Sequence, residues 1–184
     1  MHNLRALAAV ASVAVAMLAM AGPAAAGTAP CANATAMPGQ ASEAVLSKAT
    51  VCLLNRERTS RRMRGLRVNR RLSRAALAHT RDMVEKRYFE HVSKSGADVV
   101  DRLLSTGYLG RVRSWLVGEN LAWGTHSLST PRQTVTSWMN SPGHRANILK
   151  RRFREIGIGI VFHAPARTSD RVAATYTTTF GYRR

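Results

Sequence analysis

The sequence has few acidic residues, few cysteines and no apolar run long enough for a typical membrane span. Only 10 of its 184 residues are Asp or Glu, against 28 Lys and Arg, so the formal net charge is +18 at pH 7. Aromatic residues form 6% of the chain and do not alternate with the basic ones. With no recognisable nucleic-acid-binding module, we expect no nucleic-acid partner. The length fits one domain with short appendages.

Residues 1–26 have the pattern of a secretory signal peptide. Arg5 supplies a positive charge, an alanine-rich apolar run follows over residues 6–20, and Ala-Ala-Ala at residues 24–26 provides a cleavage pattern. The run is short for a membrane span, which favours cleavage before Gly27 over a retained anchor. We therefore expect a secreted, extracellular protein with no transmembrane segment after cleavage. A monomer is the expected state, although the sequence carries no signal for the oligomeric state.

Two cysteines, Cys31 and Cys52, remain after that cleavage. In an oxidising compartment an even pair favours one disulfide over two free thiols. The bond would close a loop of about 20 residues and contribute about 3 kcal/mol in the chain-entropy model.

The densest basic segment is residues 56–74, which contains nine arginines and a single acid, Glu57. Such a segment can bind an anionic polysaccharide, an envelope polymer or a membrane surface. It can equally be a solvated basic face without a partner. The sequence leaves both readings open.

Helical signals come first along the chain and strand signals last. Residues 27–41 are rich in Ala, Pro and Gly and are predicted to be an extended leader. Ser42 and Thr130 are predicted to cap helices. The expected helices cover about 43–58, 73–83, 95–107, 131–140 and a short segment after Ser141 to Ile148, and the expected strands cover 116–122, 156–160 and 172–180.

Residues 156–160 alternate strictly between isoleucine and glycine. This predicts a strand with isoleucines on one face, and with Gly157 and Gly159 against a packed neighbour on the other. An antiparallel hairpin at the end of a mostly helical chain favours an α+β fold, with helices on a small, mainly antiparallel sheet.

Sequence position distinguishes a histidine expected in the core from the histidines and the acid that are candidates for a site. His79 lies on the apolar stripe of the second helix and is predicted to be a hydrogen-bonded core residue. His91 and His144 lie at the edges of elements beside Ser, Gly or Pro, where sites are commonly built. Glu119 lies in the apolar segment 117–123, so it must pair with an arginine, pin a loop or serve a site.

Six segments resemble the CAP superfamily, which includes the cysteine-rich secretory, antigen 5 and pathogenesis-related class 1 proteins. They are CLLNRER, LAHTRDMVEKRYFEHVS, DRLLSTGY, GENLAWG, SWMNSPGHRANIL and EIGIGI, in that order, and they fit the bacterial secreted branch. The resemblance implies a three-layer α–β–α sandwich (the SCP fold) over residues 42–184.

The resemblance also implies a ligand-binding cleft. His91, Glu119 and His144 match two histidines and one acid of the family's site, and Asn120 follows within the Gly-Glu-Asn segment. The position of the second acid, three residues after Trp138, holds Ser141. The Tyr-x-Gln-like end of the family's last strand is also missing.

Two imidazoles and one carboxylate can bind zinc or another divalent cation weakly, with an open coordination position. The same groups can act as a Glu-oriented general base on Ser93 or Ser141, or can simply brace the cleft. Ser141 before Pro142 is equally typical of a helix cap. No catalytic residue is secure, and no cofactor is required by the sequence.

Two functions follow from these residues. The first is a non-catalytic extracellular module that binds a lipid, a sterol-like molecule or an envelope ligand, with a basic adhesive face. The second is an extracellular hydrolase, metal-assisted or based on the His and Glu residues, that acts on peptide or envelope polymer.

Overall fold

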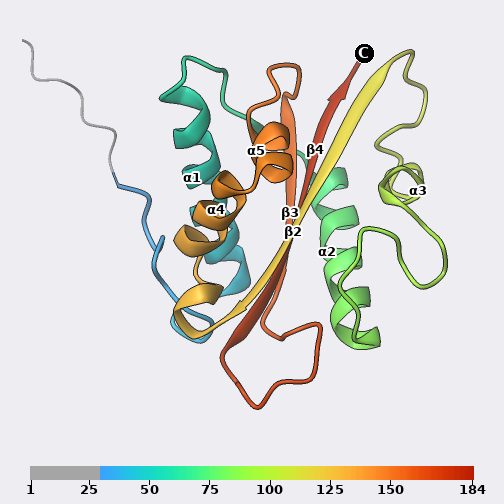
Figure 1. Ribbon diagram of the computed structural model, residues 1–184. Coiled ribbons are helices and arrows are strands. Elements are labelled where there is room, and N and C mark those ends of the chain that lie inside the picture. The colour runs from blue at the N-terminus through green and yellow to red at the C-terminus, as the bar shows by residue number, and fades with distance from the viewer. Residues whose placement is uncertain (1–29) are drawn as a thin grey trace, which may run out of the picture. The chain divides into compact units, whose positions relative to one another are not determined.

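A four-stranded sheet with the order β1-β3-β4-β2 forms the centre of the protein (Figure 1). The structure is a computed structural model that describes residues 30–184, so the predicted signal peptide and residues 27–29 lie outside it. Its elements are α1 (Glu43–Thr59), β1 (Arg67–Val68), α2 (Arg70–Lys86), α3 (Val99–Ser105), β2 (Trp115–Thr125), a 3-10 helix (His126–Ser129), α4 (Pro131–Asn140), α5 (Pro142–Ile148), β3 (Glu155–Val161) and β4 (Ala173–Arg183).

Helices cover both faces of this sheet: α1, α4 and α5 lie on one side, and α2 and α3 on the other (Figure 1). Strands β2 and β3 pair antiparallel with β4, and only the two-residue β1 pairs parallel, with β3. The predicted α+β class, the three-layer α–β–α sandwich and the mainly antiparallel sheet are therefore confirmed.

The isoleucine–glycine alternation of β3 explains how closely the layers approach. Ile156, Ile158 and Ile160 belong to the main apolar core with residues of α1, α4 and α5. On the opposite face, a Cβ added at Gly159 would lie 2.4 Å from the Cα of Leu77 in α2. The predicted facing is confirmed, and glycine is needed because the α2 backbone occupies the space of a side chain.

Side-chain caps set most helix boundaries. The hydroxyls of Ser42 and Thr130 accept hydrogen bonds from the backbone at the starts of α1 and α4, as predicted. The second helix begins at Arg70, earlier than predicted, because Asn69 caps it. The third begins at Val99, four residues later than predicted, because Asp98 is its N-cap in a capping box.

Two further predictions need correction. Residues 65–69 were expected to be a loop, yet Arg67 and Val68 form β1; two residues carry no periodicity by which a strand can be recognised. The leader is not extended over the part that the structure describes. Residues 32–35 form turns, and Cys31 and Ala34 are buried in the main core.

The predicted disulfide between Cys31 and Cys52 is confirmed, with 5.8 Å between the two Cα atoms. It joins the N-terminal part of the leader to the middle of α1 and closes a separation of 21 residues. Its place explains why the leader packs on the core, because one covalent link holds it against α1.

Arg58 near the end of α1 is fully buried and has no acidic partner within the described residues. Its guanidinium donates to the carbonyl oxygens of Arg64 (2.9 Å), Ile148 (2.6 Å), Lys150 (3.2 Å) and Phe153 (3.2 Å). These bonds tie the turn after α1 to the connection between α5 and β3. Burial, and then the charge of Arg154, lower the pKa of Arg58.

Strand β2 is an edge strand, and helical side chains cover its outer carbonyl groups. Trp138 Nε1 of α4 donates to the Leu121 carbonyl at 2.8 Å, and Asn147 Nδ2 of α5 donates to the Glu119 carbonyl at 3.1 Å. These bonds satisfy two groups that an edge would otherwise present to another strand.

In residues 30–184, no helix combines the length and the apolar character that crossing a membrane requires.

Candidate functional site

The loop that carries His91 starts where α2 ends. Arg87 takes the left-handed conformation (φ 53°), which stops the helix and turns the chain back. His79, which is 1% exposed, holds the loop through a 3.0 Å contact between its Nε2 and the Glu90 carbonyl. The prediction that His79 is a hydrogen-bonded core residue is confirmed. Its burial lowers its pKa, so the ring is kept neutral.

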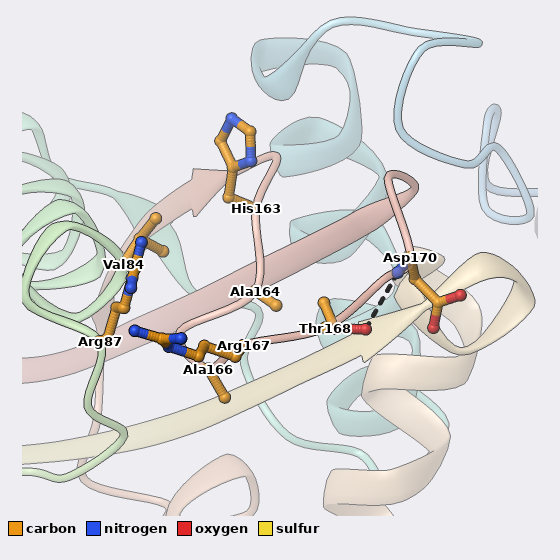
Figure 2. A pocket seen from close by; sticks show the side chains of 8 residues that line it. All are labelled: Val84, Arg87, His163, Ala164, Ala166, Arg167, Thr168 and Asp170. Carbon is orange, nitrogen blue, oxygen red and sulfur yellow. Dashed lines mark hydrogen bonds between the residues drawn. The ribbon is translucent and has the colours of Figure 1, made fainter.

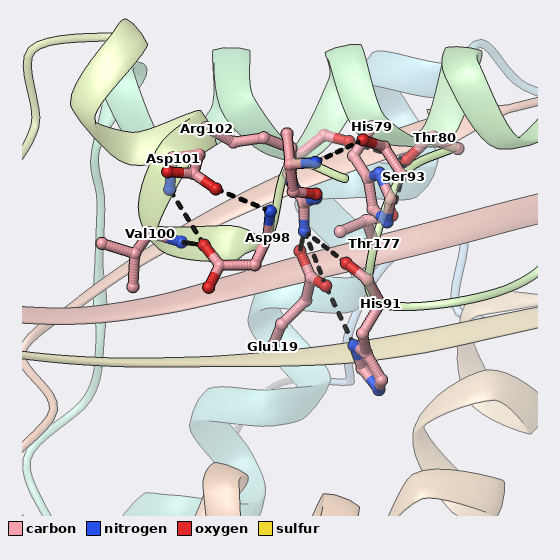
Figure 3. A network of polar contacts seen from close by, with 12 residues as sticks. His79, Thr80, His91, Ser93, Asp98, Val100, Asp101, Arg102, Glu119 and Thr177 are labelled. Atoms are coloured by element: carbon pink, nitrogen blue, oxygen red, sulfur yellow. Dashed lines mark hydrogen bonds and ion pairs between the residues drawn. The ribbon is translucent and has the colours of Figure 1, made fainter. Parts of the chain in front are cut away.

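Glu119 of β2 lies at the centre of a polar cluster with His91 and Arg102 (Figure 3). Arg102 of α3 donates from Nη2 to both carboxylate oxygens, at 3.0 and 2.9 Å, and also to the His91 carbonyl at 3.0 Å. His91 Nδ1 lies 2.9 Å from Glu119 Oε1. The Glu119 side chain is 3% exposed and that of His91 is 57% exposed, so only the imidazole faces solvent.

His144 reaches this region from α5, on the other side of β2. Asn120, which is fully buried, donates to the His144 carbonyl at 3.1 Å and accepts from Asn147 Nδ2 at 2.9 Å. Burial is the main cause of a lowered pKa for His144, and the charge of His91 lowers this pKa further. Asn120 therefore holds α5 against β2 and does not face solvent.

The two serines proposed as nucleophiles, Ser93 and Ser141, lie at a turn and at a helix start, where a serine commonly has a structural role. Ser93 Oγ accepts from the Ala97 backbone N–H at 3.0 Å and lies 2.9 Å from Ser95 Oγ, so it closes a turn. Ser141 occupies the N-cap position of α5, as predicted, but its hydroxyl makes no capping hydrogen bond. No hydrogen bond within residues 30–184 joins either hydroxyl to His91 or His144.

The three residues predicted to bind a divalent cation do not fit one in this arrangement. Both oxygens of Glu119 are bonded to the Arg102 guanidinium, whose positive charge would repel a metal ion at the same place. In the part of the chain that the structure describes, no three His, Cys, Asp or Glu side chains are grouped so as to hold a metal. Zinc binding stays a prediction of the sequence alone.

Four cavities in the described part of the chain lie outside this polar cluster. One of about 350 Å³ lies between α1 and α4, and one of about 370 Å³ lies between α4 and α5. A third, of about 350 Å³, is lined by the end of α2 and the β3–β4 loop, with Arg87 and Arg167 among its lining residues (Figure 2). A fourth, of about 400 Å³, lies beside the turn after α1.

The sequence and the fold agree with a known family. Residues 51–179 match the model of CAP, the cysteine-rich secretory protein family. The chain belongs to the CAP family. The uncharacterized protein YkwD of Bacillus subtilis is 36% identical over 127 residues, which is 69% of this chain and 47% of YkwD. The uncharacterized membrane protein YlbC of the same organism is 36% identical over 85 residues, which is 46% of this chain and 22% of YlbC. The chain thus spans about half of one curated relative and about a fifth of the other.

Solved structures show the same fold. An extracellular protein with an SCP domain from Bacillus anthracis superposes with a TM-score of 0.57 at 25% identity, covering 77% of this chain and 44% of that one. An outer surface protein of Borrelia burgdorferi gives 0.60 at 20% identity, covering 74% and 92%. The latter likeness concerns the fold alone.

Two members of the cluster were not recognised in the sequence, Arg102 and Asn147. Arg102 lies within the family-like segment DRLLSTGY, but it is one of many arginines and nothing in that segment marked it as the partner of Glu119. Asn147 lies within SPGHRAN, three residues after His144, and this spacing on a helix was a usable signal.

Proposed function

We propose that this CAP-family protein is an exported binding module that holds an envelope, lipid or sterol-like ligand without cutting it. The observation that carries the proposal is the contact of Arg102 with both oxygens of Glu119. A buried carboxylate that is neutralised in this way fixes the positions of the β2 edge, α3 and the His91 loop. It leaves no free acid in the cluster to activate water.

Export is supported by the signal-peptide pattern of residues 1–26 and by the relatives. The Bacillus anthracis structure is described as an extracellular protein and the Borrelia burgdorferi one as an outer surface protein. The disulfide between Cys31 and Cys52 is consistent with an oxidising compartment.

Two neighbouring cavities support an apolar part of the ligand. The α1–α4 and α4–α5 cavities share Met139 and Asn140 in their linings, so they adjoin on either side of α4. The α4–α5 cavity is mainly apolar, with Leu149 in its lining, whereas the α1–α4 cavity combines Leu53 and Val135 with charged residues of α1 and α4. A lipid tail or sterol ring system is the class of group that such surfaces accept.

Retention of envelope material on the immobilised protein in low salt, with mass spectrometry of what is eluted, tests this function. We expect specific lipids or polymer fragments above the background of an uncoated matrix. Met139→Lys places a charge where the two cavities meet and should reduce retention of apolar ligands. The matched control is Leu128→Lys, at a side chain that is already 56% exposed. Retention of nothing above background would remove the support for a binding function.

One observation favours the second candidate, a hydrolase. The exposed imidazole of His91 lies 2.9 Å from Glu119 Oε1, and an acid in this position can orient a histidine as a general base. The hydrolase reading predicts that fragments are released from envelope polymer or peptide and that His91→Ala with His144→Ala abolishes this release.

A further inference from the structure

A cavity of about 400 Å³ beside the turn after α1 is lined by four arginines and Met63. The arginines are Arg62, Arg64, Arg151 and Arg154, and they come in two pairs that are almost 90 residues apart in the sequence. We call this cavity the arginine pocket. No acidic residue lines it.

The buried residue Arg58 holds the two walls of the arginine pocket in place. Its buried guanidinium donates to carbonyl groups on both walls, those of Arg64 on one side and of Ile148, Lys150 and Phe153 on the other. Met63, 9% exposed, is held by its own N–H bond to the Arg58 carbonyl at 3.1 Å. The pocket is therefore preorganised, although the arginine side chains on its rim reach into solvent.

The four guanidinium groups are not neutralised by the protein. Within the described residues 30–184, none of the ion pairs includes any of the four. The nearby acid Glu57 is paired with Arg61 at 2.7 Å. Arg154 bonds only carbonyl groups, those of Arg151 and Phe153, and its charge acts on the buried Arg58. An anion in the pocket would relieve this mutual repulsion.

The fold also separates this pocket from the rest of the basic segment 56–74. Arg71 donates to the Gly107 carbonyl at 2.9 Å and Arg74 to that of Thr106 at 3.3 Å, on the opposite side of the sheet. The continuous basic run in the sequence is thus divided between two surfaces. In the pocket, Arg62 and Arg64 of this segment lie beside Arg151 and Arg154, which come from a distant part of the sequence.

We propose that the arginine pocket binds successive phosphate groups of a linear phosphate polymer. The planar guanidinium fork matches phosphate oxygens, and four forks around one cavity suit several anionic groups better than a single carboxylate. None of the exposed large apolar residues lines the pocket, so it lacks the apolar contacts of a membrane-surface site. The inference rests on the proposed binding function and assigns a chemical class to its basic partner.

Binding of inorganic polyphosphate to the purified protein, measured by calorimetry over a range of salt concentrations, tests this site. Arg64→Ala with Arg151→Ala removes two exposed side chains whose guanidinium groups make no intramolecular hydrogen bond in the described structure. We expect the affinity to fall about tenfold or more. The slope of log affinity against log salt concentration should become shallower by up to about two units, one for each arginine removed. Arg87→Ala with Arg167→Ala removes the same charge from the cavity of Figure 2 and should change affinity less than about twofold.

Equal weakening by the two double variants would overturn the proposal, because net charge alone would then explain binding. It would also be overturned if anionic phospholipid vesicles bound through Arg64 and Arg151 while polyphosphate did not. Failure of this site is distinguishable from failure of the binding function. Envelope material retained equally by wild type and Arg64→Ala/Arg151→Ala would leave the binding function standing without the pocket.

Discussion

Arg58 and Glu119 are both charged and both buried, yet the protein neutralises them in different ways. Arg58 is surrounded by backbone carbonyl groups and has no counter-charge within the described residues. Glu119 is bonded to a full counter-charge, Arg102, and to an imidazole that faces solvent. The groups around Arg58 are backbone carbonyls of the turn after α1 and of the α5–β3 connection, so this charge holds two loops together. The surroundings of Glu119 include an exposed side chain, so this charge shapes a surface that a ligand can reach.

Replacing Arg58 should cause the largest loss of stability. Arg58→Met leaves several buried carbonyl groups without their donor, and we expect the free energy of unfolding to fall by about 4 kcal/mol. Urea unfolding followed by tryptophan fluorescence, to which the buried Trp138 contributes, measures this loss with the disulfide intact. Arg61→Met, just beyond the end of the same helix and exposed, should lose under about 1 kcal/mol. A similar small loss for Arg58→Met would show that the carbonyl cluster does not hold the two loops together.

Replacing Arg102 should have a smaller effect that can be rescued. Arg102→Met leaves Glu119 buried without its cation and should lower the free energy of unfolding by about 3 kcal/mol. Adding Glu119→Gln removes the uncompensated charge and should recover about 1 kcal/mol or more. No single acid-to-amide change offers such a rescue for Arg58. Strictly additive losses in this double-mutant cycle would remove the distinction between the two buried charges.

His79 provides a third and smaller case, a buried group that stays neutral. Its pKa is lowered from 6.5 in the folded protein, chiefly by burial, so below about pH 6.5 the unfolded chain binds a proton that the folded chain does not. Stability is thus fully present above this pH and declines as the pH falls, by at most about 1.4 kcal/mol per pH unit.

Unfolding experiments between pH 7 and pH 5.5 test this expectation. His79→Gln keeps a donor for the Glu90 carbonyl and should show a shallower decline than the wild type. His126→Gln is the control, because His126 is an exposed histidine in a pair with Asp170. An unchanged pH dependence in His79→Gln would show that burial of this imidazole does not contribute to acid sensitivity.

Much of the fold was predictable because its signals are local. The caps at Ser42 and Thr130, the Ile-Gly alternation of β3 and the pair of cysteines each depend on a short segment and a general rule. The predictions failed where a boundary depends on a tertiary contact or on the choice between two caps. β1 exists only because it pairs with β3, and α3 starts late because Asp98 forms the cap.

The candidate site was only partly predictable. His91, Glu119 and His144 stood out by their positions in the sequence, and the family resemblance then assigned them to one cleft. Glu119, in an apolar segment, required a partner that the sequence did not identify. Arginine is so frequent in this chain that neither Arg102 nor Arg58 was distinctive. Arg58 did have a usable signal, since it lies four residues after the buried Leu54 on the inner stripe of α1. The basic segment is divided between two surfaces because the chain turns after α1. Sequence periodicity does not predict this turn.

Mass spectrometry of the material released when envelope polymer is incubated with the protein tests most directly whether the His91–Glu119–His144 region binds without cutting. The wild type and the His91→Ala/His144→Ala variant are compared with a protein-free control. The account predicts that neither protein releases fragments above the control, while the wild type still retains its ligand on a matrix. Fragments that the wild type releases and the double variant does not would contradict it and establish a hydrolase.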